Sequence, residues 1–321
     1  MTTSGTATFN LNLNQIVRSS LRKIGAISSG ETPDNQTVQD CTEQLNMLVK
    51  ALDATGLHIW TETEATLFLQ PGQYSYTLGS GSTDHATESY TATSLATAAS
   101  SGDTSISVAS ATGFGDGYNV GIALDNGDLF WTTQSGAAVG TTITLSNPLT
   151  DAAASDSAVY VYQTNIIRPL RVVSGRRFAF SGSLDTQMIP LSRIDYRNMP
   201  NKTNTGTITQ YFYDPKGGAN AQGTIWLWPA PSDVSSAFKF TWWRPVQDFS
   251  TQANTPDLPN EWLDALVWNL AYKMAPEYDC PPQRYAMLKE QAALSLDLVM
   301  GWDREPESYL FGYNADQTAV V

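Results

Sequence analysis

Positive charge is missing from more than a third of this chain. Residues 51–167 contain no lysine or arginine, whereas the rest of the chain carries 18 basic and 20 acidic residues. The eleven acids of the basic-free region are Asp53, Glu62, Glu64, Asp84, Glu88, Asp103, Asp116, Asp125, Asp128, Asp151 and Asp156. The net charge of −13 is therefore regional. Such a surface argues against specific nucleic-acid binding there, and favours either a solubility surface or one that does not adhere to passing DNA.

Cysteine, histidine and long apolar runs are scarce as well. Cys41 and Cys280 are too few for a disulfide framework, and we expect two buried free thiols. His58 and His85 have no cysteine or histidine neighbours at metal-ligand spacing. No apolar run approaches the ~20 residues of a membrane span. Residues 1–10 do not resemble a signal peptide, so we expect a soluble protein made in the cytosol.

Catalytic signatures are also lacking. The chain has no phosphate-binding Gly-Lys-Ser/Thr loop and no Gly-x-Ser-x-Gly elbow. Glu62 and Glu64 share a face of a predicted strand, which a glycosidase could use, but two solvated strand residues are the more ordinary interpretation. Asp125-Asn-Gly-Asp128 lacks the distal glutamate of a calcium loop and predicts a hairpin turn. We therefore predict a protein without enzymatic activity, cofactor or metal.

Helical periodicity appears near both ends of the chain. Residues 12–24 have an apolar face and end at Gly25. A second helix is predicted to start with Thr32 as N-cap and to end at Gly56, and a last helix to cover residues 283–300.

The helix predicted from Asn260, its expected N-cap, to Pro276 is apolar on two sides. One stripe comprises Leu263, Leu266, Val267, Leu270 and Met274, and the other comprises Ala265, Trp268 and Tyr272. A surface helix needs one apolar stripe. The second stripe therefore predicts burial against another part of the fold or against a neighbouring subunit.

Between the helices the apolar period changes from 3.6 to 2, which predicts strands. Two of them, residues 60–70 and 73–78, are joined by a turn at Pro71-Gly72. The predicted fold is α+β: a terminal α-helical bundle, a central β-domain and an inserted small β-barrel or sandwich. The predicted segments are 1–56 and 253–301 for the bundle, 57–80 and 166–252 for the β-domain, 81–165 for the insert and 302–321 for a C-terminal docking arm.

Two groups of side chains allow alternative interpretations. Trp226, Trp228, Trp242 and Trp243 could line a sugar-binding face, but large aromatic residues mostly pack in cores. Seven basic residues could contact DNA or pair with acids of neighbouring copies, and we favour the pairing. They are Arg18, Arg22, Lys23, Arg168, Arg171, Arg176 and Arg177.

An ordered set of short motifs runs through the chain. They are Gln70-Pro-Gly-Gln-Tyr-Ser-Tyr-Thr-Leu78, Arg168-Pro169, Ile189-Pro-Leu191, Ile194-Asp-Tyr196, Tyr211-Phe-Tyr-Asp-Pro215, Ile225-Trp-Leu-Trp-Pro229, Trp243-Arg-Pro245, Leu258-Pro-Asn-Glu-Trp262 and Ala275-Pro-Glu-Tyr278. In order and spacing the set resembles the head-to-tail adaptor family of short-tailed phages, also called tail tubular or packaged-DNA-stabilising proteins. The resemblance covers most of residues 10–300 except the block 81–165.

The resemblance implies a structural role without a cofactor. Members of the family form rings, usually of twelve copies, below the portal protein, and these rings extend the DNA channel and carry the tail nozzle or tail tube. Packaged double-stranded DNA would pass through without sequence-specific binding. The expected location is the head-tail junction of the virion, with assembly in the host cytoplasm. A glycan-binding β protein, such as part of a tail fibre, is the alternative.

The last twenty residues contain an apolar cluster outside any periodic pattern. Its members are Tyr309, Leu310, Phe311 and Tyr313. We expect this arm to become ordered on docking against the portal or an adjacent copy, or alternatively to fold back on its own bundle. Together with Ala265, Trp268 and Tyr272, these residues are the predicted subunit or portal interface.

Overall fold

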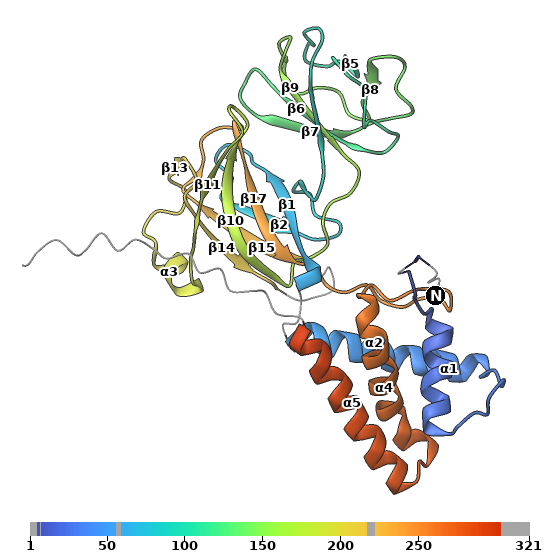
Figure 1. The fold of residues 1–321 in the computed structure, drawn as a ribbon. Coiled ribbons are helices and arrows are strands. Elements are labelled where there is room, and N and C mark those ends of the chain that lie inside the picture. Colours follow the sequence, from blue (N-terminus) through green and yellow to red (C-terminus); the bar gives the residue numbers. More distant parts are fainter. Residues whose placement is uncertain (1–4, 7, 56–58, 217–221, 303–321) are drawn as a thin grey trace, which may run out of the picture. The chain divides into compact units, whose positions relative to one another are not determined.

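The computed structural model describes residues 5, 6, 8–55, 59–216 and 222–302. The chain is 28% helical and 29% strand, which confirms the mixed α+β class. It divides into two compact units, shown in Figure 1. Residues 1–60 and 246–321 form the first, here the helical unit, and residues 61–245 form the second, here the β unit.

The helical unit contains four α-helices from the two ends of the chain. They are α1 (Leu13–Ile24), α2 (Asn35–Thr55), α4 (Leu263–Met274) and α5 (Pro282–Trp302). Short 3₁₀ turns cover Ile59–Thr61, Asn260–Trp262 and Ala275–Tyr278. The helices share one apolar core, whose fully buried members include Ile16, Val17, Leu21, Cys41, Leu45, Leu270, Met274 and Leu288. Sequence segments more than 200 residues apart thus build a single core.

The predicted ends of the helices were right for α1 and partly wrong elsewhere. Asn12 and Gln15 form a reciprocal capping box, and Gly25 adopts a left-handed conformation with φ of 87°. For α2, the predicted cap Thr32 is wrong. The Asp34 carboxylate accepts a hydrogen bond from the Thr37 amide at 2.8 Å and so occupies the capping position.

The predicted cap of α4 is also wrong. Asn260 begins a 3₁₀ turn, and Pro259 precedes it without a side-chain capping bond. At the other end, α4 stops at Met274, and Pro276 lies in the following 3₁₀ turn. A proline lacks the amide that would continue the α-helical hydrogen-bond ladder, which explains the change of helix type.

The β unit is built from two main sheets. Their strands are β1 (Glu62–Phe68), β3 (Ala86–Thr87), β10 (Arg171–Ala179), β11 (Leu184–Gln187) and β17 (Ser236–Trp243) in the order β11-β10-β17-β1-β3, and β2 (Ser75–Leu78), β12 (Ile189–Pro190), β14 (Gln210–Asp214) and β15 (Gly223–Trp228) in the order β12-β14-β15-β2. A parallel pair, β13 (Thr205–Gly206) and β16 (Ala230–Pro231), and the helix α3 (Arg193–Asn198) complete it.

Strand alternation places one row of large side chains from each sheet in a shared core. Phe238, Phe240 and Trp242 of β17 are fully buried, and so are Ile225 and Leu227 of β15. The turn predicted at Pro71-Gly72 exists, but β1 and β2 belong to different sheets. The turn therefore carries the chain from one sheet to the other, a connection that sequence alternation does not distinguish from a hairpin.

The insert, residues 81–165, adds a second apolar core to the β unit. Its strands are β4 (Thr91–Ser94), β5 (Ser105–Ser107), β6 (Asn119–Ala123), β7 (Leu129–Thr133), β8 (Thr142–Thr144) and β9 (Ala158–Tyr162), arranged as a β4-β9-β6-β7 sheet and a β5-β8 pair. Val120, Ile122, Ile143 and Val159 are fully buried in its core. The first strand of this block, β3, pairs instead with β1 of the main sheet.

Candidate functional site

The predicted interface helix α4 is apolar on two sides, and its own chain covers much of both. Its first stripe faces the core of the helical unit, with every member buried. On the second stripe, Ala265 is buried in a small cluster with Trp262 and Val299 of α5. Ala265 therefore packs inside the unit.

The other members of the second stripe are half-buried. The Lys23 Nζ atom lies 3.3 Å from the centre of the Trp268 ring, a close cation–π contact. Burial lowers the pKa of Lys23, and the nearby Asp264 carboxylate opposes this shift. The Tyr272 ring lies 5.3 Å from that of Tyr285 on α5. Only part of this stripe is thus available to another subunit.

A third apolar surface, which we call the α5 stripe, was not predicted. Met287, Leu294 and Leu298 are 46%, 55% and 77% exposed. Their spacing of seven and four residues aligns them on one side of α5. Because α5 is apolar on both its buried and its exposed side, its overall periodicity is weak, and the sequence pattern hides the second face. The remaining predicted interface residues, Tyr309, Leu310, Phe311 and Tyr313, lie outside the described residues.

The carboxylate pair of β1 is a surface feature. Glu64 forms an ion pair with Arg176 of β10, and Glu62 accepts a hydrogen bond from the Trp243 indole at 3.3 Å. Asp125–Asp128 form the predicted turn between β6 and β7, with Gly127 at a φ of 92°. Among the described residues, no group of three potential metal ligands exists, and no helix is long and apolar enough to cross a membrane. His58 lies outside those residues.

The outer face of the second main sheet carries aromatic residues that the sequence placed in the core. Trp242 is buried, as predicted, whereas Trp226, Trp228 and Trp243 are only half-buried. Trp226 stacks on Phe212 with ring centres 5.2 Å apart, and both rings contact Tyr196 of α3. The period-2 pattern puts Trp226 and Trp228 on one side of β15, and Trp243 lies on β17 of the other main sheet. Helix α3, which covers part of that side of β15, was not predicted.

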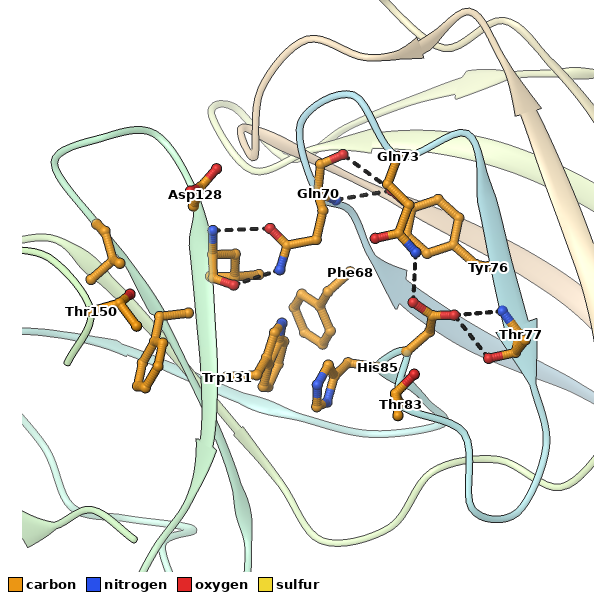
Figure 2. Close-up of a pocket in the computed structure, with 14 residues that line it drawn as sticks. Phe68, Gln70, Gln73, Tyr76, Thr77, Thr83, His85, Asp128, Trp131 and Thr150 are labelled. Carbon is orange, nitrogen blue, oxygen red and sulfur yellow. Dashed lines mark hydrogen bonds between the residues drawn. The ribbon is translucent and has the colours of Figure 1, made fainter. Parts of the chain in front are cut away.

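A cleft of about 680 Å³ lies between the insert and the main sheets. Figure 2 shows its lining, which comes from β1, β2 and the turn between them, the segment before β3, and β7 with neighbouring loops of the insert. Its walls include Phe68, Gln70, Asp84, Asp128 and Trp131. Sequence reasoning missed it because the residues on its two sides are about sixty positions apart.

One polar side chain bonds across the cleft, and another is held on its main-sheet side. The Gln70 amide donates to the Leu129 carbonyl oxygen and accepts from the Leu129 amide, as a paired strand would (Figure 2). Asp84 accepts hydrogen bonds from the Thr77 amide and hydroxyl and from Gln73. These groups are therefore occupied by bonds within the chain.

His85 and Trp131 form an aromatic contact between the main sheets and the insert. We call this contact region, with Gln70 and Leu129, the joint. The His85 and Trp131 rings lie face to face in Figure 2. The ring centres are 3.9 Å apart with 11° between the planes, and His85 Nδ1 lies 2.6 Å from the Tyr162 hydroxyl. A Cβ atom on Gly121 would lie 2.7 Å from the Trp131 ring, so this strand position requires glycine. Burial lowers the pKa of His85 to about 4, which leaves it neutral at physiological pH.

The chemistry available in the cleft is that of a structural joint. His85 has lost its capacity to act as a base near neutral pH, because its pKa is far from 7. The Trp131 ring, a natural platform for a sugar, has His85 stacked on it and packs closely against Gly121. Among the lining residues, Asp128 and Thr150 are exposed and Phe130 is half-buried, and we call these three the rim of the cleft.

Comparison with known proteins agrees with the adaptor resemblance. Residues 154–309, slightly less than half of the chain, match the family described as SU10 adaptor protein, a phage head-tail adaptor family. The match confirms the resemblance and supports a structural role in a phage virion. No curated protein matches the chain.

One solved structure with a partial likeness is a tailspike of phage origin. It is the Gp54 tailspike of Acinetobacter baumannii bacteriophage AP22 in complex with A. baumannii capsular saccharide. The sequence identity is 17% and the TM-score is 0.20. The likeness covers 23% of this chain and 15% of the tailspike chain, so it carries no argument about fold or function.

Proposed function

We propose that this chain is a head-to-tail adaptor of a short-tailed phage. Copies of it, twelve by analogy with the family, would form a ring below the portal, extend the DNA channel, retain packaged DNA and carry the tail nozzle or tail tube. DNA would pass without sequence-specific binding. The ring would be assembled in the host cytoplasm and belong to the head-tail junction of the virion.

The observation that carries this proposal is the family match over residues 154–309. The matched residues include strands β10 and β17 of the first main sheet and all of α4 and α5. The helical unit also exposes the α5 stripe, and aligned exposed apolar side chains of this kind are typical of a protein interface. Subunits of a ring bury such surfaces against each other. In a monomer the same leucines would stay exposed to water, which is unfavourable in free energy.

The interface we propose in the helical unit combines the α5 stripe with the exposed part of Trp268 and Tyr272. Ala265, on the same side of α4, is buried and contributes packing only. The arm, including Tyr309 and Phe311, would dock against the portal or an adjacent copy. Truncation after Gly301 tests the arm: a folded protein that fails to join the portal supports docking. Full assembly of the truncated chain would exclude it.

The ring itself can be tested by mixing the protein with portal rings from the same phage and imaging the complex by electron microscopy. We expect a ring of adaptor density on one face of the portal. Leu298→Glu should abolish this ring, whereas Gln283→Glu, an exposed position at the start of the same helix, should retain it. Wild-type protein that binds no portal would overturn the proposed function.

A further inference from the structure

Around α3, the β unit carries a group of basic side chains, in contrast to the insert, which has none. The Arg193 guanidinium pairs with Asp214 at 2.8 Å and lies over the Phe212 ring, and Lys216 lies over the Trp226 ring. We call the group the cationic patch. Its members are Arg168, Arg193, Arg197, Lys202 and Lys216.

An isoleucine lies within this patch. Ile194 of α3 is 70% exposed and is flanked by Arg193 and, one helical turn later, Arg197. Duplex DNA offers phosphates to the basic residues but no apolar pocket to an isoleucine. An exposed apolar residue between two arginines instead fits a protein surface that offers apolar contact beside acidic side chains.

The insert carries an acidic surface beside the cleft, whose exposed lining is mostly polar. Phe130 supplies apolar surface at the edge of the cleft, and Asp128 lies on the same edge. Asp125 and Asp151 are on the loops beside Asp128, because the Asp125 amide donates to Ala152 and the Asp125 carboxylate accepts from Ala154. None of these three acids forms an ion pair among the described residues, and the surrounding sequence has no lysine or arginine to supply one. We call this group the acidic rim.

The patch and the rim cannot meet within one copy as it is folded, since α3 and the insert lie at opposite ends of the β unit in Figure 1. We propose that the cationic patch of one copy docks on the acidic rim of the next, with Ile194 against Phe130 at the edge of the cleft and Arg197 facing Asp128. Two different surfaces on one chain make a head-to-tail contact, which closes into a ring when the rotation permits. This inference rests on the proposed ring and names a contact that forms it.

Charge reversal on each side tests the contact. Arg197→Glu damages the patch, and Asp128→Lys damages the rim, so each variant alone should assemble on portal roughly tenfold to a hundredfold more weakly than wild type. The chain with both changes restores opposite charges and should regain assembly. A mixture of the two single variants should also regain assembly, because the intact patch of one meets the intact rim of the other and the two reversed surfaces carry opposite charges. Native mass spectrometry of the mixture measures this.

Further variants keep the test independent of folding effects. Thr150→Lys places a positive charge on the rim without altering the turn at Asp125–Asp128. Ile194→Asp replaces the exposed apolar side chain of the patch. Both should weaken assembly, whereas Leu184→Asp, at a similarly exposed leucine of β11, should not. Circular dichroism confirms that each variant is folded.

Three results would overturn the proposal. The first is a wild-type ring that Arg197→Glu and Asp128→Lys leave intact. The second is a double variant that remains as defective as the single ones. The third is loss of duplex DNA binding by Arg197→Glu that Asp128→Lys does not restore, which would assign the patch to phosphates. A wild-type protein that forms no ring at all instead contradicts the proposed function.

Discussion

The helical unit and the joint between the insert and the main sheets are held by different forces. In the helical unit, aliphatic side chains from four helices exclude water, and Ser20 bridges α1 to α4 through the Val267 carbonyl. In the joint, the side-chain amide of Gln70 bonds across the cleft beside a stacked histidine and tryptophan. Apolar burial is insensitive to pH and tolerant of exchange among aliphatic residues, whereas the joint depends on particular polar atoms.

The largest expected effect concerns the apolar side of this comparison. Trp262 is 1% exposed and its ring lies 5.0 Å from that of Trp60. Trp262→Ala should lower the free energy of unfolding by ~3–5 kcal/mol, because the helical unit loses a large buried ring. Urea unfolding followed by far-ultraviolet circular dichroism measures the loss. Phe9→Ala, at a 71% exposed aromatic residue, is the control and should change stability little.

A second substitution sharpens this result. The Trp262 indole N–H has no hydrogen-bond partner within the described residues. Trp262→Phe keeps an aromatic ring and removes that unsatisfied donor, so it should cost much less than the alanine variant. If both variants were equally destabilised, a hydrogen bond of the indole would matter more than the burial of the ring.

The next largest effect is a pH dependence of stability that comes from His85 in the joint and has no counterpart in the aliphatic core of the helical unit. The pKa of His85 is about 4 in the folded protein, against ~6.5 in the unfolded chain. The unfolded state therefore binds more protons between these values, and stability falls as the pH is lowered through this range. From pH 7 to pH 5 the loss should be about 2 kcal/mol.

The comparison with His85→Phe isolates this contribution. Phenylalanine preserves a flat ring against Trp131, and the Tyr162 hydroxyl retains its hydrogen bond to Asn165. The variant should lose less stability than wild type between pH 7 and pH 5. An identical pH dependence in both proteins would show that His85 protonates in the folded state without opening the joint.

The difference between local helix packing and long-range polar contacts in the joint also explains which features could be predicted from the sequence. The ends and faces of α1 follow from a 3.6-residue period and from Asn12 and Gly25, which act locally. The tendency of large aromatic residues to pack in cores similarly predicted the burial of Trp242. The joint depends instead on Gln70 meeting Leu129, and no local pattern marks a glutamine that will pair with a distant backbone.

The α5 stripe and α3 were missed for other physical reasons. An amphipathic pattern identifies a helix by contrast between its faces, and Leu294 and Leu298 reduce that contrast by placing apolar side chains in water. Helix α3 has six residues and owes its position to Tyr196 packing on Phe212 and Trp226. Its formation is a tertiary effect that local propensity does not report.

A smaller effect tests the hydrogen bonds of the joint directly. Gln70→Met keeps the length of the side chain but leaves the Leu129 amide and carbonyl without their partner, at a cost of about 1–2 kcal/mol. Hydrogen exchange at Leu129 should become faster, while exchange in α1 should not change. Gln163→Met, an exposed glutamine outside the joint, is the matched control. Unchanged exchange at Leu129 would show that other contacts hold the joint closed.

The smallest effect on folding concerns Trp268, and it joins the comparison to assembly. A fully packed tryptophan would lose several kcal/mol on truncation, but Trp268 is half-buried and is covered by the Lys23 ammonium group at 3.3 Å. Trp268→Ala should therefore cost the isolated chain only about 1 kcal/mol, mainly from the cation–π contact and partial burial. Lys23→Ala alone should remove part of this amount, so the double variant should be less than additive. Assembly gives a second measurement. If Trp268 also contacts a neighbouring copy, Trp268→Ala should assemble on portal much more weakly than its small folding defect explains. Lys23→Ala should assemble almost normally. Equal assembly of wild type and Trp268→Ala would remove Trp268 from the proposed interface and leave the α5 stripe as the surface to examine.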